Sequence, residues 1–87
     1  MRYVILERMP FTGEFQPLAE RWLQEAEDHL SFNRHHYHER AKKVGNLLLY
    51  TELDALRIIG YQSATMPMAE YRLFAYWGVF DDNTPSK

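Results

Sequence analysis

The sequence contains no cysteine among its 87 residues, and it has only four glycines and four prolines. The absence of cysteine excludes disulfide bonds, thiolate zinc sites and thiol nucleophiles. The glycines are isolated from one another, so no glycine-rich phosphate-binding loop is present. No apolar run is long enough for a signal peptide or a membrane span. We therefore expect a cytoplasmic protein with no membrane partner.

Neither sign of charge dominates the chain. Ten Lys and Arg residues stand against twelve Asp and Glu residues, and the formal net charge is -2. This balance excludes a globally basic nucleic-acid-binding protein. Hydrophobic residues make up 46% of the sequence, which favours a folded chain over a disordered one. We expect a single compact domain over residues 1–80 and a polar flexible tail over 81–87.

Aromatic residues, in contrast, are abundant: two Trp, six Tyr and five Phe. Five of them fall within residues 71–80, and this composition predicts a strand there. The apolar run Tyr3–Leu6 predicts a second strand, near residues 2–8. We expect these two strands to belong to one small sheet.

Residues 14–44 carry apolar side chains at helical spacing. Steps of three or four residues lead from Phe15 and Leu18 through Trp22 to Val44. This period predicts a long amphipathic helical segment over 14–44, or a helix kinked near residues 31–33. Packing of the sheet against this segment would give an α+β fold.

Residues 46–60 allow two interpretations. In the first, a strand at 46–50 is followed by a helix that Thr51 caps and Gly60 ends. In the second, residues 47–59 form one buried helix, and the protein is mainly α.

Residues 32–45 form a basic segment with a net charge of +3 between two acidic segments. Its cationic and imidazole side chains are candidate ligands for a polyanion such as nucleic acid: Arg34, His35, His36, His38, Arg40, Lys42 and Lys43. On a helix, His35, His38 and Glu39 would share one face, which makes them the candidate metal ligands. Their spacing matches no helical zinc or di-iron signature, so we expect no metal and no other cofactor.

No catalytic motif is found. The serines lack a nucleophile-elbow sequence, and paired groups such as Glu25 and His29 are common on exposed helices. We expect a non-catalytic protein. The alternative is a small homodimeric enzyme or ligand-binding protein whose intersubunit pocket is lined by Glu25, His29 and Tyr37.

The aromatic strand predicts an interaction surface. In an extended chain, Tyr71, Leu73, Ala75 and Trp77 point to one side, which we expect to face the core. The candidate partner-binding residues lie on the other side or in the preceding loop: Arg72, Phe74, Tyr76, Phe80, Met66 and Met68. We expect a small protein-interaction module, such as an inhibitor, immunity protein or phage-type modulator, that binds a protein partner or itself. Nucleic-acid binding through residues 34–43 is the alternative.

Overall fold

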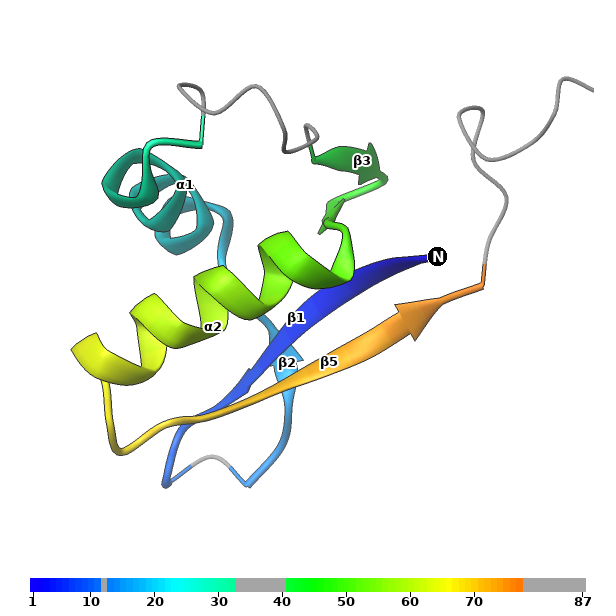
Figure 1. The fold of residues 1–87 in the computed structure, drawn as a ribbon. Coiled ribbons are helices and arrows are strands. Elements are labelled where there is room, and N and C mark those ends of the chain that lie inside the picture. The colour runs from blue at the N-terminus through cyan, green and yellow to red at the C-terminus, as the bar shows by residue number, and fades with distance from the viewer. Residues whose placement is uncertain (12, 33–40, 78–87) are drawn as a thin grey trace, which may run out of the picture.

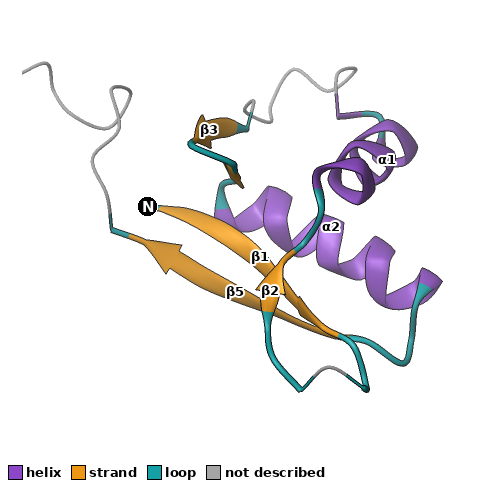
Figure 2. Cartoon of the chain, turned by 180° about the vertical axis from the view of Figure 1, so that it is seen from behind, coloured by secondary structure: helices purple, strands orange, loops and turns teal. Residues whose placement is uncertain are grey.

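The computed structural model describes residues 1–11, 13–32 and 41–77 (Figure 1). Within these residues, two helices lie side by side on one face of a small antiparallel sheet (Figures 1 and 2). The elements follow one another in the order β1 (Arg2–Arg8), β2 (Gln16–Pro17), α1 (Glu20–Leu30), β3 (Lys42–Val44), β4 (Leu47–Leu49), α2 (Glu52–Thr65) and β5 (Glu70–Tyr76). The predicted α+β class is confirmed.

Strand β1 lies in the middle of the sheet, whose strand order is β2-β1-β5. It pairs antiparallel with β5 along its whole length, from Arg2 opposite Tyr76 to Arg8 opposite Glu70. Its other edge pairs with β2 at one end and, at the other end, exchanges hydrogen bonds of 2.9 and 3.0 Å between Tyr3 and Tyr50. Both edges of β1 therefore have partners.

Hydrophobic side chains from β1 enter two separate clusters because successive strand residues point to opposite faces. Ile5 faces the helices and packs with Leu23, Ala26 and Ile58. Val4 faces the other way and packs against Leu49, with further side chains from both strands of the β3–β4 hairpin around it. We call this second side of the sheet, turned away from the helices, the outer face.

Local sequence signals explain where each helix begins or ends. Ser31, in the left-handed conformation at φ 58°, ends α1 and donates its backbone N–H to the Asp28 carbonyl. Thr51 caps α2, because its hydroxyl accepts the N–H of Asp54 at 3.3 Å. The predicted order of a strand followed by a helix in residues 46–60 is confirmed, although the helix does not end at Gly60, and the mainly α alternative is wrong.

The predicted helical segment 14–44 is wrong in extent. Only Glu20–Leu30 is α-helical among its described residues; Pro17 lies in β2 and Lys42–Val44 form β3. Pro17 has no N–H to donate and suits a short edge strand. Gly45, at φ 61°, supplies the positive φ that the β3–β4 turn requires. The apolar spacing alone did not indicate that β2 and β3 interrupt the helical pattern.

Two other predicted boundaries also differ from the structure. Helix α2 continues through Gly60 to Thr65, and its buried stripe extends to Gln62, so tertiary packing outweighs the cost of a helical glycine. Strand β5 ends at Tyr76, and residues 78–80 of the predicted strand lie outside the described residues. The predicted tail 81–87 lies outside them as well.

Trp77 was expected to face the core, but it is 80% exposed. Strand β1 begins at Arg2, which pairs with Tyr76, the last residue of β5. Trp77 therefore extends past the last residue pair of the two strands.

We predict that Ile58→Ala lowers the free energy of unfolding by about 2–5 kcal/mol, because Ile58 is fully buried and the substitution leaves a cavity. Leu53→Ala on the same helix is the matched control, since Leu53 is 62% exposed and should change stability by less than about 0.5 kcal/mol. Urea unfolding of both variants measures the difference. Equal losses would contradict this placement of α2.

Candidate functional site

The outer face combines exposed aromatic area with arginine. From β5 it receives Arg72, Phe74 and Tyr76, which alternate with the helix-facing residues of the same strand. Phe74 is 57% exposed, although it is a large apolar side chain at the middle of a paired strand. Tyr76 is half-buried because it packs against the cluster around Val4 and Leu49. An exposed aromatic ring beside an arginine is typical of a protein-binding surface.

Two arginines on the outer face contact the same aromatic ring. The guanidinium carbons of Arg8 and Arg72 lie 4.7 and 4.3 Å from the centroid of the Phe15 ring. Arg8 also pairs with Glu70, to which its Nε donates at 2.9 Å. The charge of Arg8 is therefore compensated locally, while Arg72 contributes a positive charge close to Phe74.

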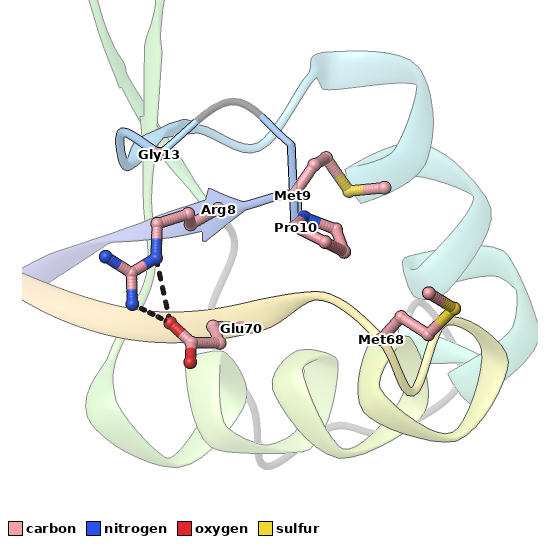
Figure 3. A pocket seen from close by; sticks show the side chains of 6 residues that line it. All are labelled: Arg8, Met9, Pro10, Gly13, Met68 and Glu70. Atoms are coloured by element: carbon pink, nitrogen blue, oxygen red, sulfur yellow. Dashed lines mark hydrogen bonds and ion pairs between the residues drawn. The ribbon is translucent and has the colours of Figure 1, made fainter.

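A pocket of about 400 Å³ opens where β1 and β5 meet the neighbouring loops (Figure 3). Its lining combines the Arg8–Glu70 ion pair with residues of low polarity: Met9, Pro10, Gly13 and Met68 (Figure 3). Among the described residues that line the pocket, Glu70 is the carboxylate, and its charge is paired with that of Arg8.

Hydrogen-bonded tyrosines join the helices to the sheet. The Tyr71 hydroxyl donates to Glu7 at 2.9 Å, and Gln62 of α2 donates to the same hydroxyl at 3.5 Å. Burial, assisted by the bond to Glu7, raises the pKa of Tyr71 to about 12. The Tyr50 hydroxyl donates to Glu27 of α1, and burial together with this carboxylate raises the pKa of Tyr50 well above its ordinary value. These contacts connect elements of the fold and lie on the side of the helices.

The structure brings three of the predicted partner-binding residues together on β5: Arg72, Phe74 and Tyr76. Met68 is 71% exposed and lines the pocket, whereas Met66 is half-buried at the end of α2. Phe80 lies outside the described residues. The two methionines are therefore not equivalent.

The predicted polyanion and metal sites fall mainly on residues that the structure does not describe. Arg34, His35, His36, His38, Glu39 and Arg40 all lie in that segment. Lys42 and Lys43 belong to β3, and Lys43 Nζ lies 3.8 Å from the Glu20 carboxylate. Among the described residues, no group of three His, Asp or Glu side chains is arranged to hold a metal ion.

Two of the three residues expected to line an intersubunit pocket make contacts between the helices. The His29 and Tyr61 rings lie 4.4 Å apart, and Glu25 accepts a hydrogen bond of 3.3 Å from the Tyr61 hydroxyl. Tyr37, the third expected member, lies outside the described residues. The described contacts of Glu25 and His29 are those of an α1–α2 packing interface.

Phe15 and the Arg8–Glu70 pair are neighbours of the aromatic strand that the sequence pattern does not predict. Arg8 and Glu70 become adjacent through the β1–β5 register, and Phe15 had been assigned to a helix. Their proximity depends on strand pairing between distant parts of the chain, for which residue spacing offers no signal.

The comparisons with known proteins add no assignment: no family model, no curated protein and no solved structure matches this chain. Neither of the helices in the described residues has the length and apolar character needed to cross a lipid bilayer.

The Tyr71 hydroxyl should make the unfolding free energy depend on pH in the alkaline range. The pKa of its hydroxyl is higher in the folded chain than the ordinary value of 10.0, so the unfolded chain loses its proton first. This contribution to stability is complete below pH 10 and is lost as the pH rises toward about 12. We expect Tyr71→Phe to reduce the pH dependence of the unfolding free energy in that interval. Urea titrations at several alkaline pH values measure it, and identical slopes for wild type and variant would contradict the assignment.

Proposed function

We propose that this protein is a small, non-catalytic interaction module that binds a protein partner through the outer face of its sheet. The observation that carries the proposal is the exposure of Phe74, beside Arg72, on a strand that is otherwise anchored in the fold. A rigid strand presents such side chains at little cost in conformational entropy on binding. In this role the protein would act in the cytoplasm as an inhibitor, immunity protein or similar modulator.

The composition of the outer face supports a protein ligand more than a small molecule. Arginine and tyrosine, represented by Arg72 and the half-buried Tyr76, are among the residue types that dominate binding energy at protein interfaces, and phenylalanine is enriched there. Their arrangement along one strand is extended, whereas small-molecule sites are usually enclosed. The neighbouring pocket with Met68 would accept an additional apolar side chain of the partner.

The charge of the outer face favours a partner with a carboxylate. Arg8 is paired with Glu70, so Arg72 is the residue whose positive charge lies nearest to Phe74 in the extended strand. A carboxylate of the partner placed against Arg72 would receive charge-assisted hydrogen bonds. Contacts of this kind also exclude partners that present a positive charge at the same position.

We predict that Phe74→Ala weakens partner binding by about 2 kcal/mol, roughly 30-fold in Kd, without unfolding the protein. Affinity capture from cell extract with wild type and Phe74→Ala identifies proteins whose retention depends on this ring, and titration calorimetry then measures Kd. Leu53→Ala is the matched control because Leu53 is similarly exposed but lies on α2.

The proposal requires a protein that wild type and Leu53→Ala retain and that Phe74→Ala loses. Equal retention by all three would overturn it. An oligonucleotide binding assay at low salt is run in parallel. A complex that Arg40→Glu with Lys43→Glu abolishes, and that Phe74→Ala leaves intact, would instead support the basic segment as the functional surface.

A further inference from the structure

Strand β5 is at the edge of the sheet, and its backbone hydrogen-bonding groups can be assigned from the pattern of its neighbours. On β1, Tyr3 exchanges hydrogen bonds with Tyr50, and the Ile5 carbonyl accepts the N–H of Leu18 at 2.9 Å. These two residues of β1 therefore point their backbone groups away from β5. Because the direction alternates along an antiparallel strand, Val4 and Leu6 point toward β5.

The same alternation applies to β5. Val4 and Leu6 pair with Phe74 and Arg72, so these two residues of β5 direct their backbone groups inward. The N–H and C=O groups of Tyr71, Leu73 and Ala75 then point outward from the sheet. Within residues 1–11, 13–32 and 41–77, no strand pairs with this edge.

This edge carries few of the features that commonly prevent strand-to-strand association. Edge strands are usually protected by charged side chains, proline or a bulge, or are very short. Strand β5 has seven residues, contains no proline, and pairs with β1 in an uninterrupted register; its charged residues are Glu70, at its first position, and Arg72. It is a regular template for an additional antiparallel strand.

We infer that the strand added to this edge is β5 of a second copy, paired antiparallel about a two-fold axis at Phe74. This pairing brings Leu73 opposite the partner's Ala75. The outward N–H and C=O groups of these two residues can then form hydrogen bonds with each other. Phe74 then faces the partner's Phe74 in a pair without mutual backbone hydrogen bonds, where side chains come closest.

Side-chain complementarity favours this register over the one centred on Arg72. Arg72 lies opposite the partner's Tyr76, a cation beside an aromatic ring, and Tyr71 lies opposite the partner's Trp77. The latter pair covers a tryptophan that is 80% exposed in the single chain. An axis at Arg72 would instead oppose two arginines, which is unfavourable.

Helix α2 supplies a second contribution. Arg57 and Tyr61 of α2 contact α1. The Arg57 guanidinium donates a hydrogen bond of 3.5 Å to the Leu30 carbonyl, and the Tyr61 hydroxyl donates one to the Glu25 carboxylate. With 3.6 residues per turn, Leu56 and Ile59 lie on the side of α2 turned away from these contacts. Strand β5 and α1 lie on opposite sides of α2 (Figures 1 and 2).

Leu56 and Ile59 are therefore on the β5 side of the helix layer. Leu56 is 50% exposed there. A two-fold axis perpendicular to the sheet brings the α2 helices of both copies to the same side. Apolar contact between them would add to the strand pairing.

The inference deepens the proposed function by naming a second copy as a partner, and it rests on that proposal for the role of Phe74. Sedimentation equilibrium over a range of concentrations is the first test. We expect a reversible change in mass from 10.4 kDa to twice that value. A wild-type chain that is monomeric throughout overturns the inference.

Cysteine substitution tests the register, and the absence of native cysteine makes each single substitution a clean probe. A residue on the two-fold axis lies opposite itself at a separation that a disulfide can bridge. Phe74→Cys should form a covalent dimer under mild oxidation at least tenfold faster than Arg72→Cys or Leu53→Cys. Equal rates for the three variants, or fastest cross-linking by Arg72→Cys, would overturn the register.

Ala75→Pro separates pairing at the edge from binding on the face. It removes an outward N–H that β1 does not use, so circular dichroism should show a folded chain and sedimentation should show loss of the dimer. Ala75→Ser is the matched control because it keeps the N–H. A folded Ala75→Pro variant that dimerises like Ala75→Ser would overturn edge pairing.

The two proposals fail in distinguishable ways. A monomeric wild type that still captures another protein through Phe74 rejects self-pairing and preserves the proposed function. A dimer that Ala75→Pro dissociates, with no other protein dependent on Phe74, supports self-pairing and rejects a separate partner on the outer face.

Discussion

The fold depends on a central strand that is paired at both edges and contributes to a hydrophobic cluster on each face. Strand β1 fulfils this condition with seven residues. Ile5 joins the core under the helices, and Val4 joins the cluster beside the β3–β4 hairpin. Because every residue of β1 is opposite one of β5, the length of β1 also determines how much of the aromatic strand is held in place.

Coverage of the two faces is unequal. Both helices pack on the side of Ile5, and Glu27, Glu7 and Gln62 add hydrogen bonds to buried or half-buried tyrosines there. On the other side, the hairpin packs around Val4 and leaves Phe74 exposed. The described residues contain no further helix or strand with which to cover this face. The candidate interaction surface therefore follows from the small number of layers.

Features encoded within a few residues could be predicted from the sequence. The apolar run Tyr3–Leu6 predicted β1, and Thr51 with Asp54 predicted the start of α2. Alternation along one strand correctly placed the side chains of Phe74 and Leu73 on different faces of the sheet. The segment 14–44 was misassigned because its apolar spacing continued across Pro17, which lies in β2, and across Lys42–Val44, which form β3; the break expected near residues 31–33 coincides with the end of α1 at Ser31. The exposure of Trp77 and the proximity of Phe15 to Arg72 depend on strand ends and long-range pairing, which spacing cannot reveal.

Edge pairing and face binding use different parts of the same strand, and the geometry makes them compatible. The edge uses the outward backbone groups of Tyr71, Leu73 and Ala75, whereas the outer face uses the side chains of Arg72, Phe74 and Tyr76. A two-fold axis perpendicular to the sheet would place both outer faces on the same side of a continuous sheet. The proposed dimer would therefore join two aromatic patches into one larger surface, and a partner that contacts both halves would bind with the advantage of two linked sites.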